Sequence, residues 1–267
     1  MFRGASAFNN SIANWNVSSV ANMSYLFEGA SSFNQAMNNW DTSSATQMTS
    51  MFKGANNFNR DISDWNVSNV TSMSNMLNFT ALSNGNKGKI HAGFASNSNW
   101  LYDWRQYVII NNSNFQTAVN LWFSNQADAN ATYGHIRDWN VSAVTNMSNA
   151  FKDRTNFNDE IGRWDVSNVT DMKYMFNNAS TFNQPLNDWD LSNMQYMEGM
   201  FSYATAFNQP LNDWDVGNVN IMGAMFLGAS AFNQNINSWN TSGVISMSYM
   251  FQEASSFNQD IGNWDLS

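Results

Sequence analysis

The 267-residue sequence contains no cysteine, two histidines and few charged side chains. Without cysteine, the chain cannot form disulfide bonds, thiol nucleophiles or cysteine metal sites. Charged residues make up 12% of the composition, against the usual quarter, and asparagine and serine take their place as polar residues. No stretch approaches the ~18 consecutive apolar residues of a transmembrane helix. Residues 1–5 do not follow the pattern of a signal peptide.

Basic residues are scarcer than acidic ones. Eleven Lys and Arg stand against 20 Asp and Glu, which gives a formal net charge of -9. Binding to a phosphate backbone depends on clustered Lys and Arg, so the sequence predicts no nucleic-acid partner. Aromatic residues, in contrast, are plentiful. The 12 Trp and 20 Phe are more than a disordered chain carries, so the chain is expected to fold.

A repeat of 25 residues organises the chain, and its unit reads I-x-x-W-[ND]-V-S-x-V-x-x-M-x-x-M-F-x-x-A-x-x-F-N-x-x. Met and Phe columns keep the same phase as the tryptophans. Tryptophan recurs at this interval in one group of three and one group of six: Trp15, Trp40 and Trp65, then Trp139, Trp164, Trp189, Trp214, Trp239 and Trp264. One such unit buries too little apolar surface to fold alone, so its stability must come from stacking on its neighbours.

Two apolar periods within the unit predict its local structure. Trp164 and Val166 alternate, which is typical of a short strand with both side chains inward. Val169, Met172 and Phe176 recur at spacings of three and four, which favours a helical segment. We therefore expect an α/β repeat solenoid of leucine-rich-repeat type, with one short parallel strand and one short helical segment in each 25-residue coil.

Two polar columns follow the apolar ones. We interpret the asparagine after the second phenylalanine as an inward ladder that satisfies backbone groups in turns. Its members are Asn9, Asn34, Asn59, Asn158, Asn183, Asn208, Asn233 and Asn258. The serine three residues after each tryptophan receives the same structural interpretation. That column contains Ser18, Ser43, Ser68, Ser142, Ser167, Ser192, Ser242 and Ser267.

Residues 78–134 leave the repeat and divide the chain into a first array (1–77), a partly helical cap or linker (78–134) and a second array (135–267). Helices are expected around 82–94 with Ser83 as N-cap, around 114–125 with Asn114 as N-cap, and around 127–133 with Gly134 as C-cap. Stack ends expose an apolar face and need caps. One continuous solenoid with an inserted loop is the alternative.

Few side chains suggest a reactive or metal site. His91 and His135 have no cysteine, serine or carboxylate at motif spacing, so both are interpreted as structural or surface residues, and no catalytic residue or cofactor is predicted. Asp165, Asp190 and Asp215 occupy one column in successive repeats, where Ca²⁺ could relieve their repulsion. Because the same column carries Asn elsewhere, a solvated or turn-capping role is the favoured alternative.

The segments 164–172 (WDVSNVTDM) and 175–184 (MFNNASTFNQ) resemble the BspA-like leucine-rich-repeat surface proteins, and more narrowly their mycoplasma-lipoprotein-type 25-residue repeats. Residues 117–122 and 133–139 are similar to the segment that opens arrays in that family. The resemblance implies a secreted or surface-attached protein, and some members are implicated in adhesion to host proteins. It identifies no ligand residue.

We therefore expect a non-enzymatic extracellular or cell-surface module that binds a protein or glycan partner through many equivalent contacts. A purely structural spacer in a larger surface protein is the alternative. The exposed apolar ends of the arrays could also associate end to end with another copy.

Overall fold

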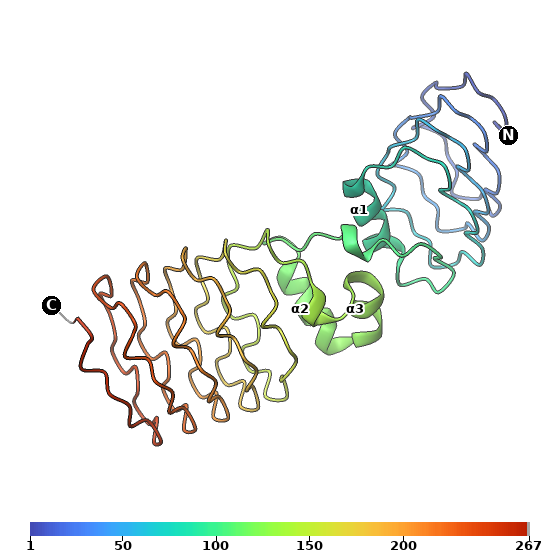
Figure 1. The fold of residues 1–267 in the computed structure, drawn as a ribbon. Helices are drawn as coiled ribbons and strands as arrows, with labels where there is room; N and C mark the ends of the chain where they lie inside the picture. The colour runs from blue at the N-terminus through green and yellow to red at the C-terminus, as the bar shows by residue number, and fades with distance from the viewer. Residues whose placement is uncertain (266–267) are drawn as a thin grey trace. The chain divides into compact units, whose positions relative to one another are not determined.

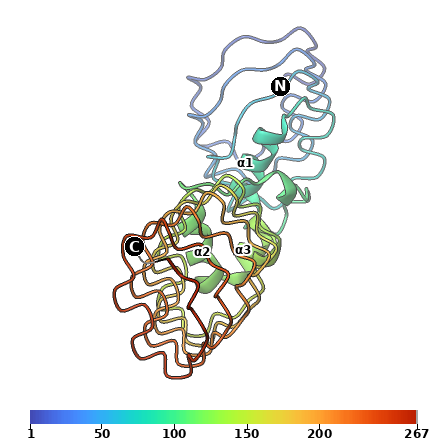
Figure 2. The ribbon, with the colours of Figure 1, turned by 60° about the vertical axis from the view of Figure 1, so that its left-hand side comes forward.

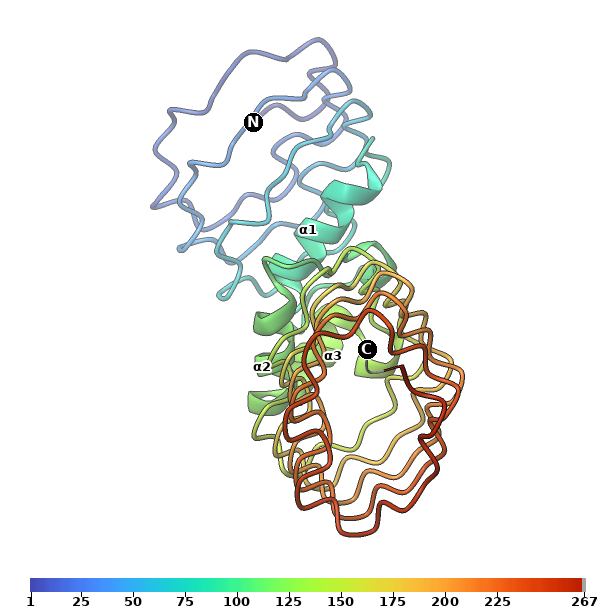
Figure 3. The same ribbon diagram turned by 90° about the vertical axis from the view of Figure 1, so that its left-hand side faces the viewer.

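The computed structural model describes residues 1–265, which form two compact units. The first unit contains Met1–Val108 and Ala127–Gly134, and the second contains Ile109–Gln126 and the chain from His135 onward. In each unit the 25-residue repeats form coils stacked on one another. The coils of the second stack lie side by side in Figure 1 and one behind another when viewed along the stack in Figures 2 and 3.

The predicted α/β layout of leucine-rich-repeat type is wrong. All helices in the described part of the chain lie between residues 84 and 138, outside the regular coils, and residues 1–265 contain no extended strand and no sheet. Parallel pairing is reduced to isolated bridges, and all but the one at Asn111 join neighbouring coils. The bridges join Asn22 to Gln47, Gln47 to Ser72, Asn111 to Ala143, Asn146 to Asp171, Asp171 to Tyr196, Tyr196 to Ile221 and Ile221 to Ser246.

The backbone hydrogen bonds explain why neither element forms. The amides of Met172, Tyr174 and Phe176 donate to carbonyls of the next coil, at 2.8–2.9 Å. The amide of Met175 and that of Asn177, each one residue further along the chain, donate instead to the carbonyl three residues earlier. The two directions alternate residue by residue, so each coil is a run of tight turns that are tied to the neighbouring coil.

Residues in the left-handed region separate these turns. Tyr174 has φ 56° and Asn178 has φ 57°, and equivalent positive values recur in the other coils. A continuous helix cannot pass through such a residue. The spacing of three that predicted a helix therefore arises from successive i to i+3 turns.

Aromatic rings fill the interior of both stacks. The ring centroids of Phe176 and Phe201 lie 5.4 Å apart, and those of Trp214 and Trp239 lie 6.3 Å apart, in near-parallel orientation. Most of the repeated indoles also donate to a carbonyl of the coil or segment before them, as Trp214 Nε1 does to the Leu186 oxygen at 2.8 Å. The repeated Trp and Phe columns of the sequence are thus the core ladders of the fold.

The asparagine ladder is confirmed as a set of backbone partners, but its predicted inward position is wrong. Asn183 Oδ1 accepts from the amide of Asn208, and Asn208 Oδ1 accepts from the amide of Asn233, both at 2.9 Å. These side chains are half-buried or exposed at the surface. The preceding phenylalanine points inward, so the backbone directs the next side chain outward. The serine column, with Ser267 outside the described residues, serves turns as predicted.

Helix α1 (Asn84–Phe94) ends the first stack, as Figure 1 shows. Ser83 accepts from the amide of Asn86, which confirms the predicted N-cap, and Leu82, Ile90 and Phe94 are buried. The short helix η1 (Arg105–Tyr107) follows. Between them, Asn97 Nδ2 donates to the carbonyls of the last coil at Val67 and Val70. These contacts satisfy backbone groups that another coil would otherwise cover.

Helix α2 (Phe115–Ser124) covers the first coil of the second stack. The Phe123 ring packs edge-on against Phe151 and Phe157, and Arg154 donates to Asn120 Oδ1 at 2.9 Å. Arg154 occupies a position that holds a small Ala in most coils, and contact with α2 explains this departure. Asn114 stands at the N-cap position, but its oxygen accepts from the Asn111 amide instead of capping the helix.

Helix α3 (Gln126–Tyr133) ends before Gly134, whose φ of 80° fits the predicted C-cap. The short helix η2 (Ile136–Asp138) then leads into the second stack. Among residues 1–265, no helix has the length and apolar character needed to span a bilayer.

Candidate functional site

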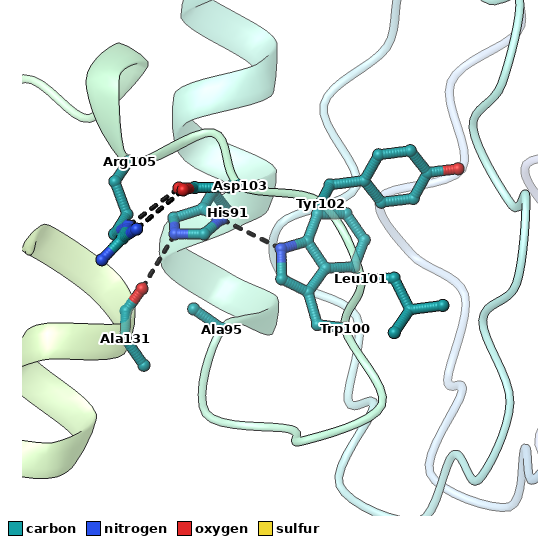
Figure 4. A pocket seen from close by; sticks show the side chains of 8 residues that line it. All are labelled: His91, Ala95, Trp100, Leu101, Tyr102, Asp103, Arg105 and Ala131. Carbon is teal, nitrogen blue, oxygen red and sulfur yellow. Dashed lines mark hydrogen bonds and ion pairs between the residues drawn. The ribbon is translucent and has the colours of Figure 1, made fainter.

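A pocket of about 260 Å³ lies in the first unit, between α1 and the segment that follows it. Figure 4 shows its lining residues: His91, Ala95, Trp100, Leu101, Tyr102, Asp103, Arg105 and Ala131. Ala131 comes from α3, His91 comes from α1, and the other residues come from the chain after α1, up to Arg105 at the start of η1. The pocket combines a buried imidazole with an ion pair, which makes it a candidate catalytic or binding site.

Both ring nitrogens of His91 have partners. The indole Nε1 of Trp100 donates to His91 Nδ1 at 2.9 Å, and His91 Nε2 lies 2.9 Å from the Ala131 carbonyl oxygen. This network assigns the neutral tautomer with hydrogen on Nε2, because Nδ1 must accept and the carbonyl cannot donate. His91 is 3% exposed, and burial lowers its pKa.

Asp103 and Arg105 form an ion pair at the rim of the pocket. The Arg105 guanidinium donates to the two carboxylate oxygens of Asp103 at 2.8 and 2.7 Å. Hydrogen bonding from Arg105 lowers the pKa of Asp103 to about 2. Both side chains are substantially exposed, so the pair orders the chain locally more than it stabilises the fold.

The hydrogen bonds of His91 join α1, the segment after it and α3 within the cap of the first unit. A general base needs a free lone pair, and the lone pair of His91 is occupied by the indole N–H. The second histidine, His135, accepts from the Arg137 amide and caps η2. Its ring packs edge-on against Trp122 at 5.0 Å. Both positions agree with the structural interpretation made from the sequence.

The three aspartates considered for Ca²⁺ are exposed, and each serves its own turn. Oδ1 of Asp165 accepts from the amide and hydroxyl of Ser167, and Oδ1 of Asp215 accepts from the Gly217 amide. The hydrogen bond from the Ser192 amide lowers the pKa of Asp190. Residues 1–265 contain no group of three or more His, Cys, Asp or Glu side chains placed to hold a metal ion. Ca²⁺ binding by this column stays a prediction.

The surface asparagine ladder has a second component that the sequence analysis missed. In five coils a glutamine follows the asparagine and donates to the preceding coil, as Gln209 Nε2 does to the oxygen and Oδ1 of Asn183 at 3.1 Å. Gln234 does the same to Asn208, and Gln184 and Gln259 each make one bond of this kind. We call this paired column the amide ladder. The recurring Phe-Asn-Gln triplet was its sequence signal.

A groove of about 270 Å³ adjoins the amide ladder between two coils of the second stack. It is lined by Glu160, Gly162, Arg163, Pro185, Asn187 and Asp188. A side chain at Gly162 would meet the Pro185 carbonyl oxygen at 2.5 Å, so glycine is needed for the two coils to approach here. The groove offers both carboxylates and a guanidinium at the surface.

Stacked 25-residue coils, with aromatic ladders inside and an amide ladder outside, define this chain as a repeat protein. The family described as Mycoplasma protein of unknown function, DUF285, matches residues 1–91, 117–229 and 211–267, and the chain belongs to this family. No curated protein matches the chain. No solved structure matches it either.

Proposed function

We propose that the chain is a non-enzymatic recognition module of an extracellular or cell-surface protein, which binds a protein or glycan partner through its repeated outer surface. The observation that carries the proposal is the amide ladder. Asparagine–glutamine pairs recur in four successive coils of the second stack, so a partner with its own repeat can make several equivalent weak contacts. The resemblance of the repeats to the BspA-like surface proteins supports the same function and the same location.

The pocket around His91 supports a non-enzymatic role, because its polar groups already have partners within the cap. The imidazole bonds Trp100 and Ala131, and Asp103 pairs with Arg105. A catalytic role would require breaking these contacts on substrate binding.

A structural spacer is the second candidate. Stacked Phe rings join each coil of the second stack to the next, and this packing favours a rigid stack. A spacer needs rigidity but no binding surface, so the two functions differ in whether a partner is captured.

A binding screen tests the proposal. The purified chain is passed over immobilised glycans and extracellular-matrix proteins, with Ca²⁺ or with a chelator. Saturable binding to any of these partners supports recognition, and no binding in either condition by folded protein would favour the spacer. Light scattering across a concentration series tests end-to-end association.

A matched variant tests the Ca²⁺ arm of the screen. Asp190→Asn keeps an Oδ1 acceptor for the Ser192 amide, as Asn240 does for Ser242 in the same column. If Ca²⁺ binds the aspartate column, this variant should lose Ca²⁺-dependent binding and keep its stability.

A further inference from the structure

We infer that the amide ladder of the second stack binds an extended, neutral, linear polysaccharide, aligned along the stack with one sugar to each coil. This inference rests on the proposed recognition function and specifies its partner and its surface. The ladder runs without interruption through four steps, from Asn158 to Asn258.

The internal bonds of the ladder fix its geometry. Each asparagine Oδ1 accepts from the backbone amide of the next asparagine at 2.9 Å in all four steps. Each glutamine Nε2 is held by the asparagine of the preceding coil. The side chains are thus ordered before any partner arrives, which reduces the entropy lost on binding.

The same bonds leave the asparagine Nδ2 and the glutamine Oε1 of each coil unused. In this ladder the asparagine Nδ2 and glutamine Oε1 atoms make no hydrogen bond to residues 1–265. None of them is a buried atom that lacks a partner. Both atoms therefore face solvent. A hydroxyl group accepts and donates at once, so a sugar hydroxyl can bridge such a pair.

The spacing and charge of the surface select the kind of glycan. The phenylalanine rings next to the asparagines, from Phe157 to Phe257, are 5.5–6.1 Å apart from coil to coil. This step is of the order of one sugar in an extended β-linked chain. The ladder itself carries no charge, and the net charge of -9 repels polyanionic glycans.

The groove beside the ladder extends the same surface. Pro185 directly follows Gln184 and is exposed, so it offers an apolar ring next to the amides. Asp188 and Arg163 supply further acceptors and donors for hydroxyl groups. The first stack lacks such a continuous surface, because Arg60 replaces the glutamine in its third coil.

Calorimetric titration with neutral cello- and chito-oligosaccharides, from the disaccharide to the hexasaccharide, tests the inference. Affinity should rise with length until the four steps are spanned. Gln209→Ala and Gln234→Ala should each weaken binding by about two- to tenfold, as expected for one lost hydrogen bond. Gln35→Ala is the matched control, since Gln35 makes the same bond to Asn9 in the first stack.

The outcomes separate the inference from the proposed function. If the wild-type chain binds a protein or another glycan in the screen but none of these oligosaccharides, recognition stands and the inference is overturned. Equal effects of Gln209→Ala and Gln35→Ala would also overturn it. Thermal unfolding of each variant shows whether a lost affinity reflects a lost fold.

Discussion

Replacing one glycine of helix α1 tests how tightly the cap closes the first stack. An added Cβ at Gly93 would lie 2.2 Å from the carbonyl oxygen of Ser63, where ordinary contact begins near 3.4 Å, so the two must separate by about 1.2 Å. The Ser63 oxygen is a backbone atom, so the clash cannot be relieved by a change of side-chain rotamer. Overpacking of this kind costs about 1–3 kcal/mol. Alanine returns about 1 kcal/mol of helix propensity, so we expect Gly93→Ala to destabilise the first unit by up to about 2 kcal/mol.

Gly85 of the same helix provides the control, because a Cβ there meets nothing within 4 Å. Gly85→Ala should leave stability unchanged or raise it by less than about 1 kcal/mol. Urea unfolding followed by tryptophan fluorescence reports the change, and hydrogen exchange of the α1 amides locates it. If both variants have the same unfolding midpoint, α1 does not pack against the third coil as closely as described.

Three further outcomes are expected. Burial lowers the pKa of His91 from 6.5, so the imidazole is protonated in the unfolded chain before it is protonated in the folded one. The free energy of unfolding should therefore fall as the pH drops below about 6.5. His91→Gln should flatten this pH dependence in urea titrations between about pH 8 and pH 5. Trp214→Phe leaves the Leu186 carbonyl without its indole donor and should cost about 1–3 kcal/mol in thermal unfolding, whereas no loss would show that the indole bond adds nothing. Asn208→Ala removes the acceptor of the Asn233 amide and should cost about the same, with faster exchange of that amide as its local signature.

The stacking of the repeats could be predicted because a 25-residue period places each apolar residue in the same environment in every coil. The Trp, Phe and Met columns are the buried ladders of the structure. The local layout could not be predicted in the same way. Apolar residues three apart occur in helices and in successive tight turns, and what distinguishes the two is backbone conformation.

The amino-acid type does not show which residues adopt the left-handed conformation that prevents a helix. Glycine marks one left-handed position in the first stack, at Gly4, Gly29 and Gly54, but the other position is held by residues such as Tyr25 and Ser50. The hydrogen bonds to the next coil impose a positive φ on residues for which this backbone conformation is unfavourable. Such constraints arise only after the coils have stacked.

The candidate sites were predictable to different degrees. Nothing in the sequence indicated the partners of His91, because Trp100 and Ala131 are brought to it only by folding of the insert. The outward position of the asparagine ladder could have been inferred from the buried phenylalanine before it. The pairing of each glutamine with the preceding coil depends on the register of stacking, which the sequence period alone does not give.

The division of the helices between the units has a consequence for how the chain is made. Helix α3 belongs to the first unit, although α2, which precedes it, belongs to the second. His91 therefore meets its carbonyl partner only after 40 more residues have been synthesised. No single cut separates the units as intact pieces, since a fragment ending at Val108 lacks α3. During synthesis, the first stack therefore lacks part of its cap until α3 has been made.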